Sequence, residues 1–398
     1  MGASGRHSQR QFILRVALFW LPVFVVGAIA ECFLWRTGET VPIDMVLEAQ
    51  EHDSEVLFMR KYLNEWPRIY RYKMIERRQP TVLALGSSRV LEFREEMFGE
   101  DASRFMNVGG LVRRVEHLDE FLDQFPDLRL KVVLLGVDVW WFNDHVDLPA
   151  LEGDDEAFSW KAHLLAVRRL LNEERRAVPG LALHPKEKRI GIQAQLANMG
   201  FRRDGSQAYN YPVPDFGPGW KFKEHTFLAV TDRIKGQYYG FPPCAGLDMT
   251  RLEILKKGLE RLKARGTLVV GFTPPFSAEC IPLLETMPQQ RPLWTQFRKE
   301  IPALFQQLDL PFVDASELGA LGLDDRYMID GYHAFETYHL HLLRRMLQDP
   351  RVRDALPTTL AAVDEALRAP GTNPWYAEFP STGQSGRRVA VMEANKGR

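Results

Sequence analysis

The stretch Thr81-Val-Leu-Ala-Leu-Gly-Ser-Ser-Arg-Val90 decides the fold of this chain. Its apolar residues 82–85 stop at a Gly-Ser-Ser-Arg turn, and a helix-compatible run follows over residues 90–97. A short buried strand that turns sharply into a helix presents its turn residues at the open edge of a parallel sheet. The first helical turn also leaves backbone N–H groups without intrahelical partners. A serine held there is accessible, and a base within reach would make it a nucleophile.

Four further apolar runs continue an α/β pattern, over residues 104–108, 131–138, 267–273 and 311–314. Helix-compatible runs lie between them, at residues 115–125, 251–264 and 293–308. This alternation predicts a parallel, doubly wound sheet with helices on both faces. Such sheets bind ligands at the carboxyl ends of their strands. Residues 144–248 are too long for a single crossover, and we interpret them as an insertion or cap.

Length and composition narrow the choice of function. The 398 residues suffice for one large α/β domain with an insertion, or for two domains. A net charge of -1 gives no reason to expect a nucleic acid as partner. Cys32, Cys244 and Cys280 lack metal-ligand spacing, and the last two either form one disulfide in an oxidising compartment or stay as two thiols. The histidines form no familiar ligand motif and the Gly-Ser-Ser-Arg turn matches no nucleotide-binding motif, so we expect no metal and no cofactor.

The N-terminal region predicts a membrane anchor. Residues 16–35 form an apolar run of about 20 residues with one acid, Glu31, which is the length of a membrane-spanning helix. Arginines at positions 6, 10 and 15 precede it and favour a cytoplasmic N-terminus, with the body outside the cytoplasm. Ala28-Ile-Ala30 has the form of a signal-peptidase site, so a cleaved signal peptide is the alternative. We favour an uncleaved anchor because the apolar run continues past that site.

The chain therefore divides into four predicted parts. Residues 1–36 hold the cytoplasmic N-terminus and the transmembrane anchor, and residues 37–80 a connecting helical region. Residues 81–350 hold the α/β domain, with its insertion at about 144–248. Residues 351–398 form a C-terminal extension that is mostly polar from about Gly371, which predicts a flexible tail.

A base for the serine is present late in the chain. The loop Asp330-Gly-Tyr-His333 comes directly before a helix-like run over residues 334–348. At this spacing the Asp330 carboxylate can bond one ring nitrogen of His333 and fix its tautomer. The other nitrogen is then free to take a proton from a serine hydroxyl. We therefore predict Ser88, His333 and Asp330 as a catalytic set.

The order of these motifs resembles the SGNH (GDSL-type) hydrolase superfamily, over about residues 80–145 and 265–348. The motifs are Gly-Ser-Ser after the first strand, Asn-Val-Gly-Gly after the second, Gly-Val-Asp after the third, and Asp-x-x-His before the last helix. The resemblance implies a flavodoxin-like, three-layer fold with Ser88 as the nucleophile. It implies an oxyanion hole built from the backbone of Ser88 and of Gly109 or Gly110, with a side-chain donor for which Asn143 is the only nearby asparagine. Ser87 stands where the family has an aspartate.

Three polar residues near these motifs are candidates for contact with the substrate. Arg89 follows the nucleophile and is suited to an anionic donor or polymer, or else pairs with Glu92 or another acid. Asn107 opens the Asn-Val-Gly-Gly motif, and Asp138 lies at the mouth of the third strand. We predict Arg89, Asn107 and Asp138 as substrate-binding residues.

The Gly-Ser-Ser turn and the anchor are similar to one branch of the superfamily, the extracytoplasmic proteins of bacterial envelope-polymer modification. That branch acts beside membrane-bound O-acyltransferases in acetylating exopolysaccharide or D-alanylating teichoic acid. The resemblance implies a single-pass inner-membrane protein with its body in the periplasm or outside the cell. It implies a serine acyltransferase or esterase that forms an acyl-Ser88 intermediate on a cell-surface polysaccharide, with a membrane-bound O-acyltransferase as partner. The alternative is a non-catalytic assembly or glycan-binding protein of a polysaccharide export or modification complex, in which Ser88 is only a turn residue.

Overall fold

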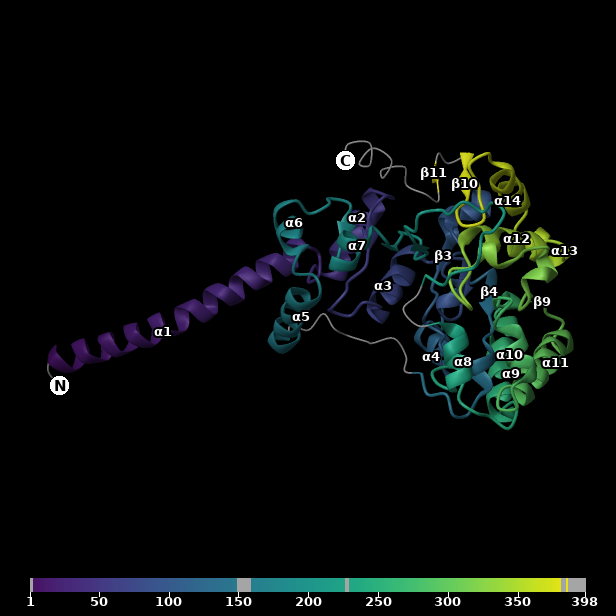
Figure 1. Ribbon diagram of the computed structural model, residues 1–398, viewed down its shortest axis with the longest axis horizontal. Helices are drawn as coiled ribbons and strands as arrows, with labels where there is room; N and C mark the ends of the chain where they lie inside the picture. The colour runs from purple at the N-terminus through teal and green to yellow at the C-terminus, as the bar shows by residue number, and fades with distance from the viewer. Residues whose placement is uncertain (1–2, 149–158, 226–228, 381–383, 386–398) are drawn as a thin grey trace. The chain divides into compact units, whose positions relative to one another are not determined.

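The computed structural model describes residues 3–148, 159–225, 229–380 and 384–385, and these divide into two compact units (Figure 1). Unit 1 comprises Met1–Pro67 and Asp154–Gly200, and unit 2 comprises Arg68–Gly153 and Phe201–Arg398. The segment that we interpreted as one insertion is therefore shared. Its residues 154–200 belong with the N-terminal part of the chain, and its remainder belongs with the α/β unit.

Unit 1 begins with a long helix, α1 (Ala3–Arg36), whose stretch Arg10–Arg36 is long and apolar enough to span a membrane. The most apolar part of that stretch is not buried by the described chain, whereas Leu34 near its end is. This agrees with the predicted single anchor, and a signal sequence would have the same properties. The other elements of unit 1 are α2 (Ile43–His52), β1 (Leu57–Phe58), α5 (Trp160–Glu173), α6 (Val178–Leu183), β5 (Arg189–Ile190) and α7 (Ile192–Ala197). Strand β1 pairs in parallel with β5.

A buried carboxylate, Glu39, joins separate segments of unit 1. Glu39 follows α1 and accepts hydrogen bonds from the backbone N–H groups of Tyr62 at 2.7 Å, Leu63 at 2.9 Å and Ile192 at 2.8 Å. A buried carboxylate is tolerated only when such donors satisfy it. Glu39 thus joins the loop after β1 to the start of α7, two segments far apart in the sequence.

Unit 2 is built on a five-stranded parallel sheet, which confirms the predicted α/β class. Its strands follow the order β3 (Phe105–Asn107), β2 (Val82–Leu85), β4 (Val132–Gly136), β8 (Leu268–Thr273) and β9 (Phe312–Asp314). Numbered along the chain this is 2-1-3-4-5, the order of flavodoxin-like doubly wound sheets. The five strands are those that the apolar runs predicted, and β2 is the stretch that carries Ser88 at its end.

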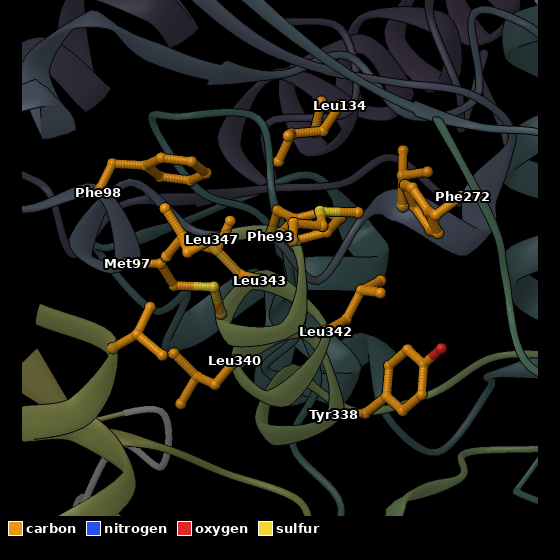
Figure 2. Packing of buried hydrophobic residues seen from close by; sticks show 14 of the residues in the cluster. Phe93, Met97, Phe98, Leu134, Phe272, Tyr338, Leu340, Leu342, Leu343 and Leu347 are labelled. Carbon is orange, nitrogen blue, oxygen red and sulfur yellow. The ribbon is translucent and has the colours of Figure 1, made fainter. Parts of the chain in front are cut away.

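Alternate residues of the central strands point to opposite faces of the sheet, and both sets are buried. Figure 2 shows one face, where Leu134 and Phe272 pack with Phe93 and with Leu342 and Leu343 of α12 (Glu336–Met346). On the other face, Gly271 approaches Phe305 of α11 (Arg291–Gln307) so closely that an added Cβ would lie 2.3 Å from its ring. Burial on both faces explains why these strands read as unbroken apolar runs.

The remaining elements of unit 2 cover this sheet or connect its strands. The α-helices are α3 (Arg68–Arg78), α4 (Glu116–Gln124), α8 (Val230–Gly236), α9 (Met249–Ala264), α10 (Ile281–Thr286), α11 (Arg291–Gln307), α13 (Pro350–Ala355) and α14 (Thr359–Arg368). The 3₁₀ helices are η1 (Ser88–Val90), η2 (Glu95–Arg104), η3 (Val139–Phe142), η4 (Leu318–Leu321) and η5 (Asp325–Tyr327). Short strands are β7 (Gln207–Ala208) and the antiparallel pair β10 (Glu378–Phe379) and β11 (Gln384–Ser385), while β6 (Gly200–Phe201) lies at the boundary of the two units.

Two expectations about local structure need correction. The helix expected over residues 90–97 is replaced by short 3₁₀ turns. The reason is that the Asn107 side-chain amide donates to the carbonyls of Val90 at 2.7 Å and Phe93 at 3.0 Å. In an α-helix these carbonyls would accept hydrogen bonds from the helix itself. The flexible tail expected from Gly371 is wrong for residues 371–380, since Trp375 is buried and the N–H of Ala377 donates to a buried glutamate, at 2.8 Å. Apart from residues 384–385, the rest of that tail lies outside the described residues.

Candidate active site

Ser88 lies at the carboxyl end of β2, as the first residue of the 3₁₀ turn η1. Gly86 makes this turn possible, because a Cβ added there would lie 2.9 Å from Val90 Cγ1 and 3.0 Å from the carbonyl oxygen of Gly136. Ser87 caps the turn by accepting a hydrogen bond from the N–H of Arg89, at 3.3 Å. The capped turn leaves Ser88 half-buried.

The structure brings the three predicted catalytic residues into one hydrogen-bonded chain. Ser88 Oγ lies 2.8 Å from His333 Nε2, although the two residues are 245 positions apart in the sequence. His333 Nδ1 in turn lies 2.7 Å from Asp330 Oδ2. Both contacts are of normal hydrogen-bond length. This is the arrangement of nucleophile, base and orienting acid that serine hydrolases use.

Asp330 is held as an anion. Its side chain is buried, and its Oδ1 accepts hydrogen bonds from the backbone N–H groups of Tyr332 at 2.9 Å and His333 at 2.8 Å. Burial by itself raises the pKa of Asp330, but the positive charge that His333 carries when it is protonated and the hydrogen bonds to Asp330 outweigh it and lower that pKa below its ordinary value. An ionised carboxylate only accepts hydrogen bonds, so His333 donates through Nδ1–H and directs the lone pair of Nε2 at Ser88.

Most of the predicted oxyanion donors are already engaged inside the fold. The N–H of Gly109 donates to Asn107 Oδ1 and the N–H of Gly110 to the carbonyl of Gly86, each at 2.9 Å. Asn143 is buried, and its amide donates to the carbonyl of Pro242 at 2.8 Å. This geometry contradicts the oxyanion roles of Gly109, Gly110 and Asn143, because a donor committed to the fold does not face the serine.

The N–H of Ser88 is different. As the first residue of η1 it has no intrahelical acceptor, and it has no hydrogen-bond partner among the residues that the structure describes. A backbone N–H next to the nucleophile lies where a developing oxyanion needs a donor. Of the donors predicted from the sequence, Ser88 alone is free for that role.

The three predicted substrate-binding residues are structural instead. Arg89 and Asp138 form an ion pair, with Nη1 and Oδ1 2.8 Å apart and both side chains fully buried. Arg89 also donates from Nε to the carbonyl of Tyr332, at 2.8 Å. Asn107 is buried with its amide on the two carbonyls named above. The prediction of substrate contact is wrong for all three, because none reaches solvent, and the acid that pairs with Arg89 is Asp138 and not Glu92.

Arg89 links the nucleophile turn to the histidine loop. It follows Ser88 in the sequence, and it holds the carbonyl of Tyr332, the residue before His333. Its guanidinium group also bonds the carbonyl of Pro275 and lies 4.4 Å from the centre of the Phe276 ring. A single buried cation therefore connects the ends of β2, β4 and β8 with the loop that carries the base.

Two arginines lie near Tyr332, the neighbour of His333, and sequence reasoning did not predict them. The Tyr332 ring lies 4.5 Å from the imidazole of His333, and the Tyr332 hydroxyl accepts a hydrogen bond from Arg233. Burial and the nearby Asp330 charge raise the pKa of Tyr332 to about 12. Arg113, whose pKa burial lowers, lies near Tyr332 as well. The position of Tyr332 inside the Asp-x-x-His motif was a usable signal, whereas Arg113 and Arg233 belong to no motif.

A cavity of about 680 Å³ opens over the ends of β8 and β9. Its wall includes the aromatic residues Trp220, Phe222 and Phe276 and the acids Glu279 and Asp325. None of Ser88, His333 and Asp330 lines this cavity. Phe276 belongs both to its wall and to the ring contact with Arg89, so the cavity neighbours the Arg89 side chain and not the serine itself. Its mixture of flat apolar surfaces and carboxylates is suited to a ligand with apolar faces and hydroxyl groups.

Residues 3–148, 159–225, 229–380 and 384–385 contain no group of three or more His, Cys, Asp or Glu side chains placed to hold a metal ion. Cys244 and Cys280 are separate buried thiols, and burial raises the pKa of Cys280 to about 12. No protein-family model, no curated protein and no solved structure matches the chain.

Proposed function

We propose that this chain is a serine acyltransferase or esterase of the SGNH type, which acts outside the cytoplasm on a cell-surface polysaccharide. The observation that carries the proposal is the hydrogen-bonded chain from Ser88 Oγ through His333 to Asp330, at 2.8 and 2.7 Å. It stands at the carboxyl edge of a parallel sheet, where such folds bind their ligands.

The chemistry follows from this geometry. His333 Nε2 removes the proton of Ser88 Oγ as that oxygen attacks an ester carbonyl, and the Ser88 N–H stabilises the oxyanion. His333 then returns the proton to the leaving alcohol, and the acyl group stays on Ser88. In the second half His333 deprotonates the acceptor as its oxygen attacks the acyl carbon, and the proton passes from His333 to Ser88 Oγ as that oxygen leaves. Water as acceptor makes the protein an esterase, and a sugar hydroxyl makes it a transferase.

The cavity over β8 and β9 supports a polysaccharide as the acceptor. Sugar rings stack their apolar C–H faces on aromatic side chains, and their hydroxyl groups donate hydrogen bonds to carboxylates. Trp220 and Phe222 supply the first kind of surface, and Glu279 and Asp325 the second. A cavity of about 680 Å³ is within the range of small-molecule sites and holds part of a polymer chain.

The long apolar helix supports the cellular setting that we propose. Helix α1 would anchor the protein in the inner membrane, with units 1 and 2 on the periplasmic or outer side. In that place a membrane-bound O-acyltransferase would supply the acyl donor across the bilayer. The chain would then transfer the acyl group to the polymer.

The test is covalent labelling of Ser88 in the full chain purified in detergent. We would treat it with a fluorophosphonate probe, measure the intact mass and locate the label by peptide mapping, with p-nitrophenyl acetate turnover measured in parallel. The proposal requires labelling and turnover that disappear in both Ser88→Ala and His333→Ala. His341→Ala, a half-buried histidine on α12, is the matched control and should keep both activities. A folded protein that is never labelled at Ser88 would overturn the catalytic proposal.

One observation favours a second candidate, a non-catalytic assembly or glycan-binding protein. The N–H groups of Gly109 and Gly110 and the amide of Asn143 are all engaged within the fold, which leaves Ser88 as the sole free donor of the predicted set. Such a protein would still bind the polymer through the cavity. It would retain polysaccharide in a pull-down, lose it on Trp220→Ala, and show no labelling at Ser88.

A further inference from the structure

Helix α5 in unit 1 carries an apolar stripe that no described part of the chain covers. Trp160, Leu164 and Leu171 are 58, 50 and 48% exposed. At 3.6 residues per turn, their side chains point within about 40° of one another around the helix axis. Ala166 and Leu170, on another side of α5, are buried. The helix therefore has one apolar face inside the unit and the apolar stripe outside it, and Leu165, 56% exposed, lies about 100–140° from the stripe residues around the axis.

Helix α5 meets α1 where the apolar stretch of α1 ends (Figure 1). His163 Nδ1 lies 2.6 Å from Glu31 Oε1, and Leu170 shares a buried cluster with Leu34. Trp35 lies one turn beyond Glu31, about 6 Å along the helix, and is half-exposed. Tryptophan at the end of an apolar helix is typical of a membrane–water interface. The contact between the two helices therefore falls at the depth of that interface.

The charges on α5 suit a membrane surface. Lys161 and Arg168 are exposed and lie along the edge of the apolar stripe, about 40–100° from its residues around the helix axis. Long basic side chains beside an apolar face reach anionic lipid headgroups while their stems stay in contact with the acyl region. The pairing of Glu31 with His163 also provides a polar partner for the one acid in the apolar run, at a depth where an unpaired carboxylate is costly.

We propose that α5 is an interfacial helix that lies on the bilayer beside α1, with Trp160, Leu164 and Leu171 in the lipid and Lys161 and Arg168 at anionic headgroups. The proposal rests on the membrane anchoring by α1 proposed above, and it adds a second lipid contact that belongs to the folded body. Because α5 is fixed to α1 by the Glu31–His163 contact, unit 1 then has one defined orientation on the membrane.

The test uses the full chain in nanodiscs that contain phosphatidylcholine and phosphatidylglycerol. Cys32 is exposed and is replaced by serine, whereas the two remaining cysteines are buried. A nitroxide label is attached in turn at Leu164→Cys, Leu171→Cys and Asn172→Cys, and its collision rates with oxygen and with a water-soluble nickel complex are compared. Labels at 164 and 171 should meet oxygen more often than nickel, and the matched exposed control at 172 should meet nickel more often.

A label at Val25→Cys, in the middle of the apolar stretch, separates failure of the anchor from failure of the interfacial helix. If that label also meets nickel more often than oxygen, the anchor itself is wrong. If it lies in lipid while the labels at 164 and 171 face water, the interfacial helix is overturned. Labels at 164 and 171 that are shielded from both reagents would show a protein partner or a second copy on the stripe, which also overturns the proposal. The double change Lys161→Glu with Arg168→Glu should lower the oxygen-to-nickel ratio at 164 in anionic discs, and an unchanged ratio would remove the role of the basic residues.

Discussion

The buried ion pair between Arg89 and Asp138 should contribute to both stability and nucleophile geometry. Both side chains are fully buried, so Arg89→Met leaves the carboxylate of Asp138 without its cation in an apolar surrounding. Removing one partner of such a pair typically costs about 3–5 kcal/mol. Arg89→Met also removes the donor that holds the carbonyl of Tyr332, next to the base.

These losses of folding free energy correspond to measurable decreases in Tm. For a unit of this size about 1 kcal/mol corresponds to roughly 2 °C in Tm, so we expect Arg89→Met to lower the Tm of the full chain in detergent by roughly 6–10 °C. Asp138→Leu leaves a buried guanidinium group and should lower Tm by a similar amount. The double variant should lose about 0.5–3 kcal/mol less than the sum of the two single changes, because it leaves no unpaired charge.

A matched surface pair provides the control. Arg261 lies 3.0 Å from Asp119, and both side chains are more than a third exposed, so Arg261→Met should cost less than about 1 kcal/mol. Labelling of Ser88 should fall by roughly 10²-fold in Arg89→Met, since a displacement of about 1 Å at the base has effects of that size. Additive losses in the double variant, or unchanged labelling in Arg89→Met, would refute the role that we give to this pair.

Three further changes test the surroundings of the site. Asp330→Asn should keep the Tm within a few degrees but lower Ser88 labelling by about 10⁴-fold, because a neutral amide neither fixes the Nδ1–H tautomer of His333 nor stabilises its imidazolium. Full labelling would contradict the orienting role of Asp330. Gly86→Ala should cost about 1–3 kcal/mol and reduce labelling, because its Cβ would lie 2.9 Å from Val90 Cγ1; an unchanged Tm would show that the turn has room to relax. Burial raises the pKa of Glu92 well above 4.5, so the folded state binds this proton more tightly than the unfolded state does. The stability that protonated Glu92 contributes is therefore complete below about pH 4.5 and is lost as the pH rises through its folded pKa. In thermal melts at several pH values, the Tm of Glu92→Gln should rise relative to that of the unchanged chain from about pH 4.5 upwards. A difference in Tm that does not depend on pH would refute the buried proton.

The parts of the fold that were predictable are those with a local cause. An apolar run that stops at Gly-Ser-Ser predicts a strand and a turn from its own residues, and Asp330 and His333 are only three positions apart. Parallel strands then place their carboxyl ends at one edge of the sheet. The meeting of Ser88 with His333 was therefore implied by the fold class, although no local pattern connects the two residues.

The failures have a common physical cause, which is pairing over long distances in the sequence. A charged residue next to a nucleophile, such as Arg89, looks like a substrate ligand until its partner 49 positions later is known. Asn107 has the sequence context of a site residue, but its amide is used to satisfy two carbonyls of the nucleophile loop. The association of residues 154–200 with the N-terminal segment depends on contacts such as that of Ile192 with Glu39, and no sequence motif predicts these contacts.

The engaged donors around Ser88 have a consequence for the rate of the proposed reaction. One oxyanion donor is typically worth about 3–4 kcal/mol in the transition state, or 10²–10³ in rate. With the Ser88 N–H as the one free donor of the predicted set, acylation by the isolated chain should be slower by about that factor than in a site with two donors. The N–H of Gly110 is bonded to the carbonyl of Gly86, in the same turn that presents Ser88, so a change that frees it would act directly on the nucleophile turn. If a polymer or a membrane partner makes that change, labelling of Ser88 accelerates in its presence, and acyl transfer is confined to the assembled complex.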